Sequence, residues 1–217
     1  MEMKRKLDIL YEDKDLLIVN KRSNYLSVST NQEKNNTLFH EVFTYIKSKN
    51  KNNKIFIVNR LDKDTSGIVV FAKNEKVKKL VQNNWDKVVR KYHAVVLGKL
   101  SKKTDTIKSY LKETKSLFVY SSNDSKNGKL AITDYEVIKE NSNYSLLLID
   151  IKTGRKNQIR VHLSDLGHPI VGDKKYGNKC NFTRMYLHAS YINLVHPITK
   201  KRIEIQSNYP NSFDAFF

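Results

Sequence analysis

The chain has 217 residues and carries 40 Lys and Arg against 22 Asp and Glu, a formal net charge of +18. A hydrophobic fraction of 39% supports a folded core and excludes wholesale disorder, while the charge favours nucleic acid or an anionic membrane surface as a partner. The single cysteine, Cys180, excludes a disulfide framework and a multi-cysteine zinc site and is typical of a reducing compartment. No apolar stretch is long enough to span a membrane, and no signal core follows the first basic residues. We therefore expect a cytoplasmic protein without membrane association.

The first half of the chain alternates between short apolar runs and polar turns. Strands are predicted at 7–11 and 16–20, and Thr37 is predicted to cap a helix with an apolar face. Two further apolar runs, 55–58 and 67–72, predict buried strands with a polar loop between them.

The second half is richer in strand patterns. A helical face at residues 77–85 precedes a strand at 88–97, whereas residues 101–129 are polar and show no clear pattern. Two strands are predicted at 132–138 and 144–151, followed by a short helix at 159–166. A terminal hairpin is predicted from residues 185–195 and 202–205. With no repeat and no linker, the pattern predicts one α+β domain over residues 1–217, rich in antiparallel strands.

Four stretches do not look like ordinary core or surface and are candidates for chemistry. They are R-L-D-K-D-T-S-G (60–67), R-K-Y-H-A-V-V-L-G (90–98), D-I-K-T-G-R-K-N-Q-I-R-V-H-L (150–163) and G-H-P-I-V-G-D-K-K-Y-G (167–177). Each also has an ordinary structural explanation: a capped turn, a packed tyrosine, a surface arginine or a plain loop. Basic residues at the start of the predicted helix near 158 oppose the helix dipole, which favours an anion there.

Other chemistries fit these residues less well. The six His show no metal-ligand spacing, and no nucleophile elbow or Walker-type loop is present. Asp62 and Asp64 are spaced as in a paired-carboxylate nuclease site, but cations flank them and no third acid lies nearby. From spacing alone, the function stays open between a basic enzyme and an RNA-binding domain.

The four stretches, in this order, closely resemble those of the RluA-type pseudouridine synthases. The segments I-L-Y-E-D-K-D-L-L-I-V-N-K (9–21), G-K-L-A-I-T-D-Y-E-V (128–137) and L-H-A-S-Y-I-N-L-V-H-P (187–197) extend the resemblance over roughly residues 8 to 210. It implies the pseudouridine-synthase fold: a bent, mostly antiparallel mixed sheet with surrounding helices and a central catalytic cleft. Because the resemblance begins near residue 8, we expect this protein to act without the small RNA-binding appendage that some members carry before the catalytic domain.

Three positions depart from the family pattern. Asn59 and Asn157 stand where His is usual, and Lys21-Arg22-Ser23-Asn24 replaces the usual K-P-x-G. Asparagine keeps a hydrogen bond of histidine but does not titrate near neutral pH. Because no step attributed to the family needs that His as acid or base, we expect these changes to affect the positioning of the loop and the target site rather than activity.

The resemblance implies that uracil is detached from its ribose, rotated and rejoined through carbon, without a cofactor or metal. It makes Asp62 the essential carboxylate, as nucleophile or as general base, with Arg160 as its ion-pair partner and Tyr92 stacked on the detached base. The target uridine must be flipped out of structured RNA, and Arg60 is a candidate to enter the vacated stack. Expected substrate contacts come from Arg60, Thr65, Arg155, Gln158, Ile159 and Leu163, although Ile159 and Leu163 also fit core positions.

We expect a monomer that acts on ribosomal RNA or transfer RNA. The resemblance does not say which RNA or which uridine. Two other hypotheses stay open at this point: a catalytically silent RNA-binding or ribosome-assembly protein on the same scaffold, and a metal-dependent nuclease. A chelator separates the nuclease from the isomerase, because only the nuclease loses activity.

Overall fold

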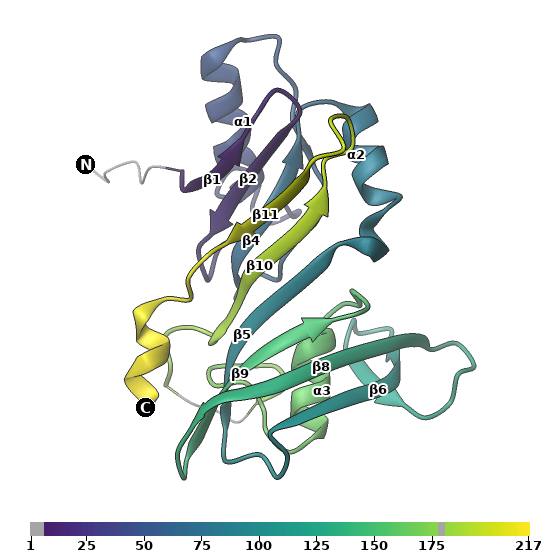
Figure 1. Ribbon diagram of the computed structural model, residues 1–217, viewed down its shortest axis with the longest axis vertical. Coiled ribbons are helices and arrows are strands. Elements are labelled where there is room, and N and C mark those ends of the chain that lie inside the picture. Colours follow the sequence, from purple (N-terminus) through teal and green to yellow (C-terminus); the bar gives the residue numbers. More distant parts are fainter. Residues whose placement is uncertain (1–6, 178–180) are drawn as a thin grey trace. The chain divides into compact units, whose positions relative to one another are not determined.

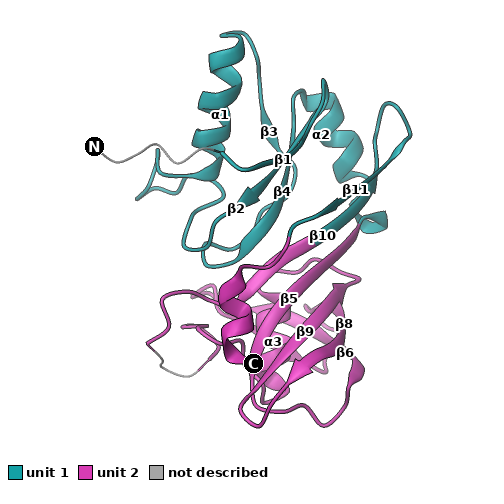
Figure 2. Cartoon of the chain, turned by 60° about the vertical axis from the view of Figure 1, so that its left-hand side comes forward, with its two compact units in different colours: residues 1–88, 191–207 teal, residues 89–190, 208–217 magenta. Residues whose placement is uncertain are grey.

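The chain forms two compact units in the computed structural model, which describes residues 7–177 and 181–217. Unit 1 comprises Met1–Val88 with Tyr191–Ser207, and unit 2 comprises Val89–Ser190 with Asn208–Phe217 (Figure 2). The expectations for Cys180 and for the first six residues lie outside the described residues. No helix in the described ranges is long and apolar enough to cross a membrane.

Unit 1 is a small sheet with two helices (Figure 1). Its elements are β1 (Ile9–Glu12), β2 (Leu16–Lys21), α1 (Leu38–Lys49), β3 (Phe56–Ile57), β4 (Ser66–Ala72), α2 (Glu75–Gln82), the second part of β10 (Leu187–Val195) and β11 (Arg202–Gln206). The strand order is β1-β2-β4-β10, with β3 paired to β4 and β11 to β10. Strand β4 is buried along its whole length, so both of its ends are fixed by the surrounding core.

The helices of unit 1 begin where the sequence provides a cap. The Thr37 hydroxyl accepts the His40 amide proton at 3.2 Å, and the Asn74 side chain accepts that of Val77 at 2.8 Å. Side-chain acceptors at these positions satisfy amides that have no partner inside the helix. The predicted cap at Thr37 is confirmed.

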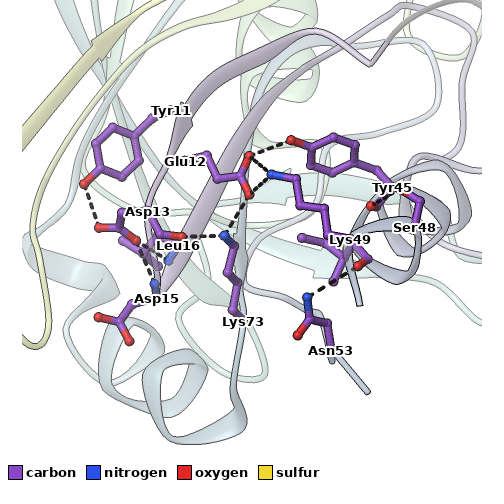
Figure 3. Close-up of polar contacts among 11 residues, drawn as sticks. Tyr11, Glu12, Asp13, Asp15, Leu16, Tyr45, Ser48, Lys49, Asn53 and Lys73 are labelled. Carbon is purple, nitrogen blue, oxygen red and sulfur yellow. Dashed lines mark hydrogen bonds and ion pairs between the residues drawn. The ribbon is translucent and has the colours of Figure 1, made fainter. Parts of the chain in front are cut away.

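A charge cluster ties the β1–β2 turn to α1 and to the end of β4. The Glu12 carboxylate accepts hydrogen bonds from Lys49 and Lys73, at 2.8 Å each, and from the Tyr45 hydroxyl at 2.7 Å (Figure 3). Burial acts to raise the pKa of Glu12, but these three donors outweigh it and lower the pKa from 4.5 to about 2. Glu12 is therefore ionised at neutral pH and holds three segments together.

Unit 2 is an antiparallel sheet with one helix packed on it. Its elements are β5 (Val89–Leu97), β6 (Thr104–Glu113), β7 (Val119–Ser122), β8 (Lys129–Glu140), β9 (Tyr144–Ile151), α3 (Gln158–Asp165), the first part of β10 and a C-terminal 3-10 helix (Asn211–Phe216). The strand order is β5-β9-β8-β6-β7, and each neighbouring pair in this series is antiparallel. Helix α3 packs Ile159 and Leu163 against a core that includes Leu147 and Ile149.

The main difference from the predicted elements lies at residues 101–129. The sequence of this segment shows no clear hydrophobic pattern, yet it forms strands β6 and β7. The two strands make an antiparallel hairpin in which Tyr110 pairs with Ser122 and Glu113 with Val119. Strand β6 alternates between exposed and half-buried positions and buries only Leu111 fully. A strand with so little buried apolar surface leaves a weak hydrophobic signal.

Candidate active site

Asp62 lies in unit 1, on the loop between β3 and β4. The Thr65 amide donates to the Asp62 carbonyl at 3.2 Å, which closes a turn directly before β4. Asp62 is half-buried, Thr65 is buried and Arg60 is exposed. The fixed start of β4 therefore determines where this turn lies, while Arg60 remains accessible to a partner.

The segment 21–27 holds the Asp62 loop through main-chain atoms. The Lys21 ammonium group, only 1% exposed, donates to the carbonyls of Tyr25 at 2.7 Å and Lys63 at 3.0 Å. The Ser27 hydroxyl donates to the Leu61 carbonyl at 2.7 Å and accepts the Leu61 amide proton at 3.1 Å. These bonds fix the backbone on both sides of Asp62 without using its carboxylate.

Two departures from the family pattern have a structural role in this unit. Asn24 adopts φ +59°, a left-handed conformation that asparagine tolerates better than most residues other than glycine. The Asn59 side-chain oxygen accepts the Val70 amide proton at 2.8 Å, which ties the start of the loop to β4. Both asparagines thus serve loop geometry, and the contact of Asn59 does not require a titratable group.

Arg160 lies in unit 2, in the first turn of α3, and forms a buried ion pair with Asp173. Its Nε and Nη2 atoms donate to the two carboxylate oxygens, each at 2.7 Å, and the two residues are 6% and 1% exposed. Burial acts to raise the pKa of Asp173, but the bonds and charge of Arg160, with the amides of Lys175 and Tyr176, outweigh it and lower the pKa below 3.8. The paired geometry fixes the plane of the guanidinium group.

The loop before α3 is organised by Gln158. Its side-chain oxygen accepts hydrogen bonds from the Thr153 hydroxyl at 2.8 Å and the Arg155 amide at 3.0 Å. Its amide nitrogen donates to Ile132 O and Thr133 Oγ1. The contacts of Gln158 described here are therefore internal, and a direct contact of Gln158 with substrate stays a prediction.

The other predicted residues of unit 2 differ in accessibility. Arg155 is exposed and its Nε donates to the Leu130 carbonyl at 2.9 Å. Tyr92 lies on β5 opposite Ile149 and is half-buried against the core, which contains Ile159 and Leu163. Ile159 and Leu163 are thus core residues of unit 2, in agreement with the expectation that they also fit core positions.

Sequence reasoning did not assign a role to Lys21, Ser27 or Asp173. Asp173 is the only acid in the fourth candidate stretch, which is the one signal that could have marked it as a partner for an arginine. The structure therefore brings Arg160 and Asp173 together in unit 2, and it places Asp62, Arg60 and Thr65 on one loop of unit 1. Within the described ranges, no group of three or more His, Cys, Asp or Glu side chains is arranged to hold a metal ion.

Comparison with known proteins gives a consistent assignment. The model of the RNA pseudouridylate synthase family matches residues 15–165. The chain is 35% identical to ribosomal large subunit pseudouridine synthase D of Buchnera aphidicola subsp. Baizongia pistaciae (strain Bp). It is also 35% identical to the uncharacterized RNA pseudouridine synthase YhcT of Bacillus subtilis (strain 168). Each match covers 94% of this chain and 69% of the relative.

A solved structure extends this result to the fold. Human RNA Pseudouridylate Synthase Domain Containing 1 superimposes with a TM-score of 0.79 at 26% identity, over 100% of this chain and 90% of that chain. The pseudouridine-synthase fold, with its mostly antiparallel mixed sheet, is therefore confirmed. The chain belongs to the RNA pseudouridylate synthase family, as an RluA-type enzyme that isomerises uridine in RNA.

Proposed function

We propose that this enzyme converts specific uridines of structured ribosomal or transfer RNA to pseudouridine, with Asp62 as the essential carboxylate. The main structural observation in favour of Asp62 is that its loop is held in place: Lys21 and Ser27 bind main-chain atoms on both sides of Asp62. A catalytic group must be held in a near-attack position, and these bonds position the loop of Asp62 through its main chain.

Arg160 is proposed to orient the reacting carboxylate, and Asp173 to orient Arg160. The ion pair with Asp173 uses two guanidinium nitrogens and fixes the plane of the Arg160 guanidinium group. A planar, preorganised fork suits a carboxylate better than the mobile ammonium of a lysine. Tyr92, on the rigid strand β5, is proposed to stack on the detached uracil.

Access to the uridine requires that the base leave its stack. Unstacking costs a few kcal/mol, and a flat cation that enters the gap recovers part of this cost. The exposed Arg60, two residues before Asp62, is proposed to fill that place. Thr65 and Arg155 remain proposed substrate contacts.

The first RNA to test is that of the large ribosomal subunit, because the Buchnera relative is named for it. Tritium release from RNA that carries 5-tritiated uridine, isolated from a strain lacking this gene, measures turnover directly. We expect release without added metal or nucleotide and in the presence of a chelator. No release from any RNA pool of that strain would contradict the proposal.

Asp62→Asn tests the essential carboxylate in the same assay. We expect turnover to be abolished, with RNA affinity within about threefold of wild type, because phosphate contacts supply most of the affinity. Asp64→Asn is the matched control, since it lies two residues later on the same loop and is expected to remain active. Full turnover by Asp62→Asn would assign the carboxylate role elsewhere.

A further inference from the structure

We propose that the tip of the β6–β7 hairpin, residues 114–118, binds an unpaired base of the substrate RNA by stacking on Phe118. This deepens the proposed function and rests on RNA as the substrate. It assigns a second contact point for the RNA, in addition to the reacting uridine. The neighbouring base of the same RNA strand is the expected occupant.

The tip presents apolar side chains to solvent on a hydrogen-bonded turn. Leu117 is 62% exposed and Phe118 is 40% exposed. Thr114 holds both: its amide donates to the Phe118 carbonyl at 2.8 Å, its carbonyl accepts the Leu117 amide at 2.9 Å, and its hydroxyl accepts the Phe118 amide at 3.1 Å. The turn is therefore built to keep these side chains at the surface.

The backbone of the tip is not at its conformational minimum. Leu117 adopts φ +63°, a left-handed conformation that is costly for a residue with a bulky side chain. Burial of Leu117 does not compensate for this cost, because most of its side chain is exposed. Strain of this kind persists where surrounding contacts impose it, and such positions cluster at binding sites.

A cation lies beside the aromatic surface. The Lys175 ammonium group donates to the Leu117 carbonyl at 3.0 Å and lies 5.4 Å from the ring centres of both Phe118 and Tyr176. The two rings are 5.0 Å apart. An aromatic face with an adjacent ammonium group matches the two parts of a nucleotide, since the ring stacks on the base and the cation attracts the phosphate.

The same contacts join the tip to Arg160. The Tyr176 ring centre lies 5.2 Å from the Arg160 guanidinium carbon, and the amides of Lys175 and Tyr176 donate to Asp173, the partner of Arg160. The Tyr176 hydroxyl also accepts the Val119 amide proton at 3.2 Å. Phe118 is thus one aromatic ring away from Arg160 within a single bonded assembly of unit 2, so a base stacked on Phe118 is held beside the Arg160–Asp173 pair.

The chain offers a matched control on another element. Phe43 on α1 is 38% exposed, and the Lys47 ammonium group lies 5.3 Å from its ring. Exposure and cation distance therefore match those of Phe118. Lys47 follows Phe43 by one helical turn, an ordinary surface arrangement, and α1 has no described bond to the Asp173 loop.

The decisive experiment measures binding of a fluorescein-labelled dodecamer of uridylate by anisotropy. Phe118→Ala is expected to raise the Kd about 5- to 100-fold, the usual range for the loss of one stacking contact, and Phe118→Trp to restore it within about threefold. Phe43→Ala is expected to leave the Kd unchanged. An abasic dodecamer, with the same phosphates and no bases, is expected to bind wild type and Phe118→Ala equally.

Salt dependence separates stacking from charge. Phe118→Ala removes no cation, so its slope of log K against log salt should equal that of wild type, whereas Lys175→Ala should lower the slope by about one phosphate contact. Wild-type affinity in Phe118→Ala would overturn the inference, and so would an equal loss on the abasic dodecamer. If Phe118→Ala melts at a lower temperature, the comparison of Phe118→Trp with Phe118→Leu decides, since only tryptophan keeps a ring.

These outcomes are independent of the test of the proposed function. If wild type releases no tritium, the proposed function fails whatever the dodecamer shows. If wild type is active and Phe118→Ala has both wild-type affinity and wild-type turnover, only the stacking surface is wrong.

Discussion

The two units hold their proposed catalytic groups by opposite means. In unit 1, the Lys21 ammonium group and the Ser27 hydroxyl bind main-chain atoms around Asp62. In unit 2, the carboxylate of Asp173 binds the Arg160 side chain itself. Hydrogen bonds to the main chain around Asp62 remain when the Asp62 side chain is replaced. The ion pair that holds Arg160 is lost when the side chain of Arg160 or Asp173 is replaced. We therefore expect substitutions in the two units to differ in how much they reduce turnover and how much they reduce stability.

Among the residues that support the proposed catalytic groups, the largest expected effect is at Asp173. Asp173→Asn keeps the shape but leaves the buried Arg160 cation without its paired carboxylate, and breaking such a pair costs about 3 to 5 kcal/mol. With Arg160 misplaced, we expect single-turnover rates to fall on the order of a thousandfold. The control is Asp214→Asn, which breaks an exposed ion pair with Lys139 and is expected to leave the rate unchanged. A wild-type rate in Asp173→Asn would remove Asp173 from the positioning of Arg160.

Arg160→Lys keeps the charge and removes the fork. Lysine cannot bind both oxygens of Asp173 in one plane, so we expect a loss of turnover of roughly tenfold to a thousandfold, with RNA affinity and its salt slope nearly unchanged. Single-turnover kinetics with saturating enzyme at two salt concentrations measure both quantities. Wild-type turnover with a shallower slope would make Arg160 a phosphate contact.

Lys21→Met tests the support in unit 1. It removes the ammonium donor from the buried carbonyl of Tyr25 and the partly buried carbonyl of Lys63, and an unsatisfied buried acceptor costs about 1 to 3 kcal/mol. We expect a loss of about 2 to 4 kcal/mol in urea unfolding. Turnover should fall about tenfold, because the main chain of the loop retains the Ser27 bonds. Lys14→Met, at an exposed lysine of the same unit, is the control. Unchanged stability and turnover in Lys21→Met would contradict the inference that Lys21 holds the Asp62 loop.

Glu12→Gln should affect stability alone, with a defined pH dependence. Because the folded-state pKa of Glu12 is about 2 against 4.5, its stabilisation is complete above about pH 4.5 and is lost as the pH falls toward 2. We expect wild type to exceed Glu12→Gln by about 2 kcal/mol at pH 7 and the two to converge near pH 2. Urea titrations of both proteins across this range measure the difference.

Its control is Glu75→Gln, which affects an exposed pair with Lys79 on α2. Surface pairs of this kind contribute little, so the control should follow wild type at every pH. A difference between wild type and Glu12→Gln that stays constant with pH would show that shape, not charge, is responsible. Reduced turnover in a folded Glu12→Gln protein would place this cluster closer to function than its geometry indicates.

Local patterns in the sequence predicted most elements of the fold. Thr37 marked the start of α1, and the apolar runs at 67–72 and 144–151 correspond to β4 and β9. The apolar run at 55–58 is reduced to the two-residue strand β3. The hairpin of β6 and β7 was missed because its strands bury few apolar side chains. Hydrophobic periodicity reports burial, so an exposed hairpin leaves little trace in it.

What the sequence by itself determined was the family, through four stretches in a fixed order, and with it the enzyme class and the identity of the candidate residues. Only the tertiary structure decided which side chain or main-chain group binds each candidate residue. Asp173 lies 13 residues beyond Arg160, and Lys63 lies 42 residues beyond Lys21, so neither pairing follows from a helix or strand period. A buried charge takes its partner from whichever loop the packed core brings beside it, because leaving it unpaired is too costly. That choice depends on the whole fold and is not encoded in any local pattern.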